Sequence, residues 1–239
     1  MTGAEASDPA APTLDHLVVM ADTLAEGAAW CRATLGASPV EGGRHALFGT
    51  HNLLLHLGSP AFPRRYLEII ATDPEAEPAP GPEGRPRARW FDMDDPALRQ
   101  RVRRRGPQLI HWVARVPDID AAVTALATQG IDRGDVLAAS RATAQGALRW
   151  KISVRPDGQR LFHGLLPTLI EWGGQHPTDD LPASGVTLRA GLIIHPRAAQ
   201  LLAACAAVGL GRVAAHTGAR AASQLRFDTP SGLVLLTSV

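Results

Sequence analysis

Residues 108–116 read QLIHWVARV, a run whose residue types and alternation are typical of a buried strand. The alternation predicts that Leu109, His111 and Val113 share one face of that strand. An earlier run, LDHLVV, places His16 in the same setting. Two strands of one pattern, each with a central histidine, indicate that the chain contains a repeated unit.

The two runs also continue alike. Eight residues after His16, Leu24 opens an apolar stripe at helical spacing, and eight residues after His111, Ile119 opens another. Each stripe is followed by a glycine, which commonly ends a helix. A strand followed by a helix is therefore repeated, with histidine at the same point in each copy.

Each copy closes with a strand that carries a glutamate. The first, YLEII, carries Glu68 on the face that it shares with Tyr66, and the second, LIEW, contains Glu171. Glu68 follows His16 by 52 residues and Glu171 follows His111 by 60. We interpret the two glutamates as equivalent because these separations are comparable.

Each of these glutamates is expected to have a partner. Burying an ionised carboxylate inside an apolar strand costs roughly several kcal/mol of folding free energy unless it is paired or bound to a metal ion. If the two copies pack about a twofold axis, the histidines and glutamates converge and can hold one divalent cation, such as zinc, nickel, iron or manganese. The predicted ligands are His16, Glu68, His111 and Glu171. The simpler explanation of each residue alone is a histidine bonded to the backbone or a glutamate paired with an arginine.

The repeat predicts an α+β protein in which paired βαβββ modules form a cupped mixed sheet around a central cavity. The modules are expected at residues 13–72 and 108–177. A partial third module, expected to extend the sheet, covers residues 185–239. Residues 1–12, rich in alanine and proline, are predicted to be disordered.

Residues 73–107 are rich in proline, arginine and glutamate and are predicted to form a linker with one short helix near residues 96–104. Their arginine run, RQRVRRRG, raises the question of nucleic-acid binding. The 239-residue chain has 24 basic and 23 acidic residues, a net charge of +1, and no aromatic residues interleave the run. These features favour a solvated surface over a nucleic-acid interface.

The composition is ordinary for a soluble globular protein, with 45% hydrophobic and 20% charged residues. No apolar run is long enough to span a bilayer, and the first residues resemble no signal peptide, so we expect a cytoplasmic protein without membrane contact. The expected partner is a small-molecule substrate. The sequence leaves open whether one chain or a homodimer completes the cavity.

Several segments resemble a known family. The openings LDHLVV and LIHWVARVPDID, with the closings YLEII and LIEW, are similar to the paired modules of the vicinal oxygen chelate superfamily. The order of His16, Glu68, His111 and Glu171 resembles glyoxalase I. The segment GTHNLLLHLG and the WFD motif at residues 90–92 look more like the glyoxalase-like domain family of bacteria.

The resemblance implies a metal-dependent lyase or isomerase that acts on a small carbonyl compound. The metal would act as a Lewis acid on a carbonyl or on the enediolate formed from it. Glu68 or Glu171 would move the proton next to that carbonyl, and Glu171 is the favoured base. Expected substrate contacts are His51, Asn52, Trp112 and Trp172.

Two alternatives stay open. An extradiol-type dioxygenase of the same fold needs iron on two histidines and one carboxylate. A metal-free protein that sequesters a ligand needs no cation, and Glu68 and Glu171 would then pair with arginines such as Arg115 or Arg149.

Overall fold

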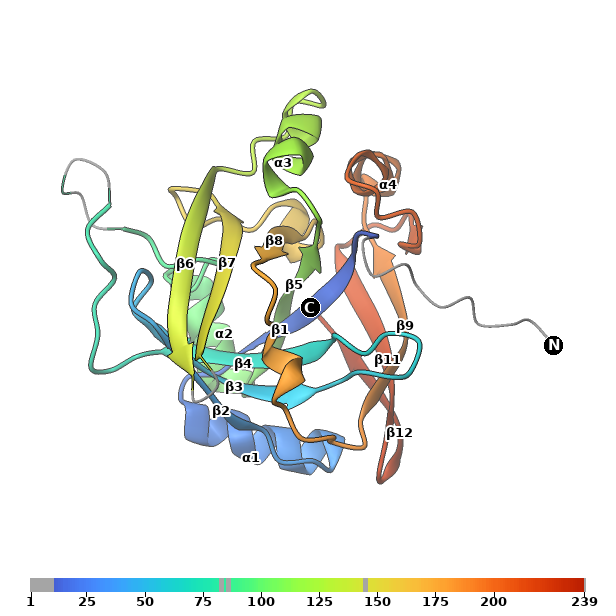
Figure 1. The fold of residues 1–239 in the computed structure, drawn as a ribbon. Helices are drawn as coiled ribbons and strands as arrows, with labels where there is room; N and C mark the ends of the chain where they lie inside the picture. The colour runs from blue at the N-terminus through green and yellow to red at the C-terminus, as the bar shows by residue number, and fades with distance from the viewer. Residues whose placement is uncertain (1–10, 82–83, 85–86, 144–145, 239) are drawn as a thin grey trace.

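The computed structural model describes residues 11–81, 84, 87–143 and 146–238. Within this part the predicted α+β fold of paired modules is confirmed (Figure 1). Eight strands form one curled sheet in the order β2-β3-β4-β1-β5-β8-β7-β6, and four form a second sheet in the order β10-β9-β11-β12. The disorder expected for residues 1–12 falls almost entirely outside the described residues.

Each module has the order strand, helix and three strands. The first consists of β1 (Thr13–Met20), α1 (Leu24–Leu35), β2 (Val40–His45), β3 (Thr50–His56) and β4 (Tyr66–Thr72). The second consists of β5 (Gln108–Arg115), α3 (Ile119–Ala127), β6 (Asp135–Thr143), β7 (Gly146–Val154) and β8 (Thr168–Trp172). The C-terminal part consists of β9 (Thr187–Ile194), α4 (Ala198–Ala207), β10 (Ala215–His216), β11 (Ala222–Thr229) and β12 (Gly232–Thr237).

The helix α1 shows how the local sequence sets these elements. The Thr23 hydroxyl accepts a hydrogen bond from the Glu26 backbone N–H at 3.2 Å, which satisfies one of the free donors at the start of the helix. Gly36 ends the helix in the left-handed conformation, with φ of 68°, where a side chain would be strained.

The two modules join where β1 and β5 pair antiparallel. His16 lies opposite Val113, and His111 lies opposite Val18. The register shifts between Val18 and Val19, so that Ile110 is an extra residue, as in a β-bulge. The expectation that Leu109 shares a face with Val113 is therefore wrong, because the bulge reverses the alternation between them: the two side chains belong to different core clusters.

The curled sheet has a concave inner face and an outer face. The inner face is covered by a cluster that includes Val18, Ile70, Val113, Ile152 and Ile170. The outer face packs against α1 and β11 through a second cluster that includes Leu17, Val19, Leu67, Ile69 and Phe227. The predicted shared face of Tyr66 and Glu68 is consistent with this division, since the intervening Leu67 and the following Ile69 face outward.

The segment between the modules contributes more than a connection. It contains the expected helix, α2 (Pro96–Arg105). Before this helix, Trp90, Phe91 and Met93 are each at most 5% exposed and belong to the inner cluster. Part of the segment expected to be a linker is thus core, and it closes one side of the concave face.

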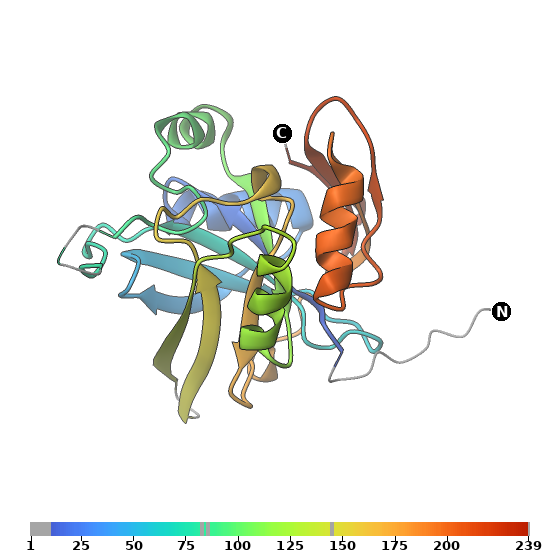
Figure 2. The same cartoon turned by 90° about the horizontal axis from the view of Figure 1, so that it is seen from above.

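The C-terminal part forms a sheet of its own, so the expectation that it extends the first sheet is wrong. Its strand β11 covers the outer face beside α1, while α4 packs next to α3, as Figure 2 shows. Leu126 of α3 and Leu201 of α4 share one buried cluster. Apolar faces of two layers therefore cover each other instead of continuing edge to edge.

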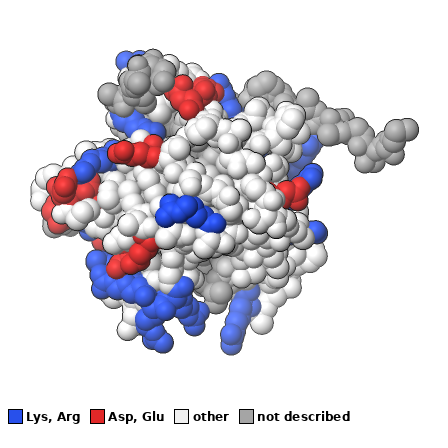
Figure 3. Space-filling model, turned by 90° about the horizontal axis from the view of Figure 1, so that it is seen from below, with Lys and Arg blue, Asp and Glu red and all other residues white. Residues whose placement is uncertain are grey.

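Charged side chains do not dominate the face of the molecule seen in Figure 3. Small groups of basic and acidic residues are interspersed there, and most of that face carries neither. No helix among the described residues is both long enough and apolar enough to cross a membrane.

Candidate functional site

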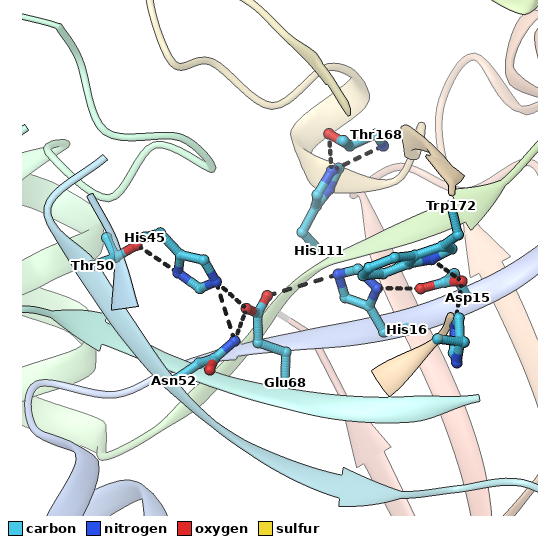
Figure 4. A network of polar contacts seen from close by, with 10 residues as sticks. Asp15, His16, His45, Thr50, Asn52, Glu68, His111, Thr168 and Trp172 are labelled. Atoms are coloured by element: carbon cyan, nitrogen blue, oxygen red, sulfur yellow. Dashed lines mark hydrogen bonds and ion pairs between the residues drawn. The ribbon is translucent and has the colours of Figure 1, made fainter. Parts of the chain in front are cut away.

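The inner face brings polar side chains of three neighbouring strands together. His16 comes from β1, Glu68 from β4 and Asn52 from β3 (Figure 4). His16 Nε2 lies 3.7 Å from Glu68 Oε2, while the Asn52 amide donates a 2.6 Å hydrogen bond to Glu68 Oε1. Asn52 is itself fixed, because its Oδ1 accepts from the Gly43 backbone N–H at 2.8 Å. The amide thereby sets the orientation of the carboxylate.

Asp15 supports His16 from the other side. Its Oδ1 lies 2.7 Å from His16 Nδ1, and its Oδ2 lies 3.0 Å from both His176 Nε2 and the Trp172 indole nitrogen. The side chain of Asp15 is fully buried. Burial alone would raise the pKa of this carboxyl, but the hydrogen bonds from His16 and His176 outweigh it and hold the pKa below its usual range. Asp15 is thus a buried anion that orients the His16 ring.

A second histidine lies on the far side of Glu68. His45 Nε2 is 3.9 Å from Glu68 Oε1, and its Nδ1 is 3.1 Å from the Thr50 hydroxyl. Burial lowers the pKa of His45 to about 4, although the charge of Glu68 acts in the opposite direction. His45 is therefore neutral near pH 7.

These side chains line a small cavity. Aromatic rings of Trp90, Trp150 and Trp172 form much of its wall, and Arg141 closes it by donating to the Gly42 carbonyl. Its volume is about 30 Å³, which is roughly the share of one water molecule in the liquid. Only a small reacting group fits between the polar side chains unless the wall moves.

His111 turns away from this group, as Figure 4 shows. Its Nδ1 lies 2.8 Å from the Gly164 carbonyl, and its Nε2 lies 3.0 Å from the Thr168 hydroxyl and 3.2 Å from the Thr168 backbone nitrogen. Burial, followed by the charge of Arg133, lowers the pKa of His111 well below its usual value. Both ring nitrogens are satisfied by the protein, so His111 is held as a neutral structural residue.

Glu171 lies on the opposite face of the sheet from Glu68. Strand β8 alternates, so Ile170 and Trp172 face the inner cluster while Glu171 faces α3. Its Oε2 accepts a 2.9 Å hydrogen bond from the Ile119 backbone N–H at the start of α3, and its Oε1 is 3.7 Å from Lys151 Nζ. The expectation that Glu171 joins the central site as ligand and base is wrong, because the carboxylate caps a helix instead.

Comparison with known proteins places this geometry in a family. The family model described as "Glyoxalase-like domain" matches residues 14–209. The chain belongs to the glyoxalase-like domain family. Through it the chain falls in the vicinal oxygen chelate superfamily, as the sequence resemblance indicated. No curated protein matches the chain.

Solved structures resemble this glyoxalase-like protein at low sequence identity. A hypothetical protein from Staphylococcus aureus has a TM-score of 0.56 at 13% identity, covering 88% of each chain. A methylmalonyl-CoA epimerase of Streptomyces coelicolor has a TM-score of 0.42 at 17% identity over 70% of this chain and 98% of its own. That of Mycobacterium tuberculosis has a TM-score of 0.36 at 18% identity over 66% and 85%. At these identities the first match shows a common fold and nothing about activity.

Members of the superfamily commonly use a divalent metal, so we asked whether the residues of this glyoxalase-like protein fit one. His111 and Glu171 have their donor atoms committed to Gly164, Thr168 and Ile119. Nowhere in the described part of the chain do three His, Cys, Asp or Glu side chains group as metal ligands. The four predicted ligands do not converge, and the residues present do not fit the expected ion.

Of the four residues expected to contact substrate, two line the cavity and two face away from it. Asn52 and Trp172 line the cavity beside Glu68. His51 precedes Asn52 on β3 and so points to the other face. Trp112 lies on the outer face, where its indole nitrogen donates to the Leu165 carbonyl at 2.8 Å.

Sequence reasoning missed Asp15, His45, Arg141 and His176. The Asp15-His16 dipeptide was a usable signal, because a carboxylate next to a histidine can hold one ring nitrogen. The other three residues carried no such signal, since only the fold brings their distant segments together. Among the described residues, neither Glu68 nor Glu171 pairs with Arg115 or Arg149, the partners expected for a metal-free binding protein.

Proposed function

We propose that this glyoxalase-like protein transfers a proton at the carbon next to a carbonyl group of a small molecule, as an isomerase or a lyase. The observation that carries the proposal is the position of His16 between a buried carboxylate and a second carboxylate that faces the cavity. Two proton-transferring groups side by side in an enclosed site suit this chemistry.

Glu68 is the base in this proposal. Its Oε1 is occupied by the Asn52 amide, whereas its Oε2 has no closer polar partner among the described residues than His16 Nε2 at 3.7 Å. That distance exceeds a hydrogen bond, so both atoms remain available to a substrate. Oε2 removes the proton from the carbon, and Asn52 keeps the carboxylate in place while it does so.

His16 supplies the complementary proton. With Nδ1 hydrogen-bonded to Asp15, its Nε2 points to the Glu68 side of the site. A proton on Nε2 makes the ring an imidazolium, and the buried Asp15 carboxylate at Nδ1 balances that positive charge. This imidazolium donates its Nε2 proton to the carbonyl oxygen as the carbon loses its own, which gives a neutral enol.

The enol has two outcomes. Return of the proton from Glu68 to a different position, while His16 takes back the oxygen-bound proton, gives an isomer. Expulsion of a leaving group from the next carbon, which takes the proton held by Glu68 while the oxygen-bound proton returns to His16, gives an unsaturated carbonyl product, which is lyase chemistry. The small cavity and its aromatic wall favour a compact carbonyl compound.

Hydrogen exchange at the carbon next to the carbonyl tests the proposed proton transfer, and the product need not be known. Wild-type protein is incubated in D2O with a panel of small ketones, aldehydes and 2-hydroxy ketones, and deuterium uptake next to the carbonyl is followed by proton NMR. Wild type should catalyse uptake into at least one compound, and Glu68→Gln should reduce the rate by about 10²-fold or more.

Glu171→Gln is the matched control, because it makes the same chemical change on the other face of the sheet. It should retain the wild-type exchange rate. Loss of exchange in Glu171→Gln with retention in Glu68→Gln would refute the assignment of the base. Absence of uptake into every compound by folded wild-type protein would count against proton transfer itself.

A further inference from the structure

A second and larger cavity lies between the two sheets, on the outer face of β1 and β5. Its volume is about 990 Å³, close to the upper end of the range for small-molecule sites. Its wall is largely apolar and is contributed by both sheets, through Leu17, Leu109 and Trp112 on one side and Leu188, Leu192 and Leu225 on the other. Glu68 does not line it, so it is separate from the site described above.

The polar part of this wall has one sign of charge. Arg65, Arg189 and Arg212 line the cavity, and no aspartate or glutamate does so among the described residues. Arg189 is paired with Asp228. A cavity with an apolar body and only positive charge at its wall is complementary to an amphipathic anion.

Arg65 is the arginine best placed to bind such an anion. Its guanidinium lies 3.7 Å above the ring of Phe62, and one terminal nitrogen is 3.4 Å from the Thr13 hydroxyl. No carboxylate of the described residues forms an ion pair with it, and its buried Nε has no hydrogen-bond partner. The stacked ring and the hydroxyl hold the group in position while its charge is left uncompensated.

Burial lowers the pKa of Arg65 to about 10, and the neighbouring Arg115 acts in the same direction. The guanidinium therefore remains charged at neutral pH. A positive charge that is partly removed from water and close to another arginine is unfavourable unless an anion joins it. A bound carboxylate can accept two hydrogen bonds from a guanidinium and relieve this cost.

We propose that the cavity between the sheets binds an amphipathic monocarboxylate of the fatty-acid class, with its hydrocarbon chain along the leucine-lined wall and its carboxylate at Arg65. A hydrocarbon chain matches the apolar lining, and a single head group matches the one arginine of the wall that is anchored yet unpaired.

The first test locates the chain of a bound carboxylate. An undecanoate with bromine on its terminal carbon is titrated into the full-length protein, because bromine quenches tryptophan fluorescence on contact. Trp112 lines the cavity, so saturable quenching is expected in wild type and should be largely lost in Trp112→Phe. Quenching of equal size in Trp112→Phe would show that the ligand binds elsewhere and would overturn the proposal.

The second test addresses the head group with a matched pair of variants. Arg65→Gln should weaken undecanoate binding by about tenfold or more and leave binding of undecanol nearly unchanged. Arg64→Gln is the control, because Arg64 is next to Arg65 in the chain but is paired with Asp179 and does not line the cavity. It should bind undecanoate like wild type.

Three outcomes would overturn the proposal. Undecanol binding as tightly as undecanoate would remove the role of the charge. Equal weakening in Arg64→Gln and Arg65→Gln would indicate a nonspecific effect of surface charge. A stable dimer in sedimentation experiments that excludes undecanoate would show that a second copy of the chain, and not a carboxylate, covers the cavity.

Discussion

Thr168 lies opposite Val113 in the second module, as Glu68 lies opposite Val18 in the first. His16 pairs with Val113 and His111 pairs with Val18, so the same local twofold axis relates the two histidines. Thr168 is therefore the counterpart of Glu68. Where the first module has a carboxylate beside its histidine, the second has a hydroxyl that contacts His111 at 3.0 Å. The repeat is symmetric in its backbone and asymmetric in its chemistry.

Thr168→Val should destabilise the protein, because the hydroxyl also accepts a 2.6 Å hydrogen bond from the buried Arg133. Its loss removes the acceptor of the buried Arg133 guanidinium and one of the two contacts at His111 Nε2, at a cost of about 1–3 kcal/mol. Urea denaturation of both proteins measures this. Thr187→Val, on the second sheet, is the control. Equal stability of Thr168→Val and wild type would show that His111 does not depend on this contact.

Asp15→Asn should impair both stability and proton transfer. The neutral amide no longer stabilises a charged His16, so deuterium exchange into a substrate should fall by about 10²-fold or more. The loss of a fully buried anion that accepts three hydrogen bonds should cost about 3 kcal/mol. Exchange is compared at a temperature where both proteins are folded. Asp22→Asn, whose carboxylate pairs with Arg103 at the surface, should behave like wild type.

The protein should lose stability as the pH falls from 6.5 to 4. The unfolded chain protonates His45 near its ordinary pKa of 6.5, whereas burial keeps the folded histidine neutral until its pKa of about 4. The unfolded state therefore binds more protons in this window, which lowers the free energy of unfolding by about 3 kcal/mol. His45→Gln should show a weaker pH dependence in urea denaturation. The control His216→Gln, at an exposed histidine, should keep the pH dependence of the wild type. If His45→Gln also keeps the wild-type pH dependence of stability, groups other than His45 cause it.

Removal of metal ions should leave the fold unchanged. The donor atoms of His111 and Glu171 already bond to protein groups, so binding an ion there would break these contacts. The midpoint of thermal unfolding and the rate of deuterium exchange should therefore be the same before and after dialysis against a chelator, with metal content followed by elemental mass spectrometry. About one ion per chain, lost in both His16→Ala and His111→Ala, would contradict this expectation.

The sequence was most informative where one local pattern decides the structure. The repeated strand and helix around His16 and His111 predicted the paired modules, and the alternation in YLEII placed Glu68 on the inner face. Both inferences depend on periodicity within a few residues, which a single strand or helix imposes by itself.

The sequence was least informative where pairing between strands decides. The extra residue Ile110 reverses the face of Leu109, and nothing in the local pattern marks it. The similar separations of 52 and 60 residues suggested that Glu171 is the counterpart of Glu68. The counterpart is Thr168, three residues earlier, because the connecting loops of the two modules differ in length. Trp90 lines the cavity, although it belongs to a segment whose composition indicated a linker.

The β1–β5 pair is a shared wall, a single peptide layer thick. His16 faces one compartment and its neighbour Leu17 faces the other. A ligand that displaces this wall from one side changes the free energy of binding on the other side, and thermodynamic linkage makes that change equal in both directions. Neither compartment can therefore be redesigned through these two strands without altering its neighbour.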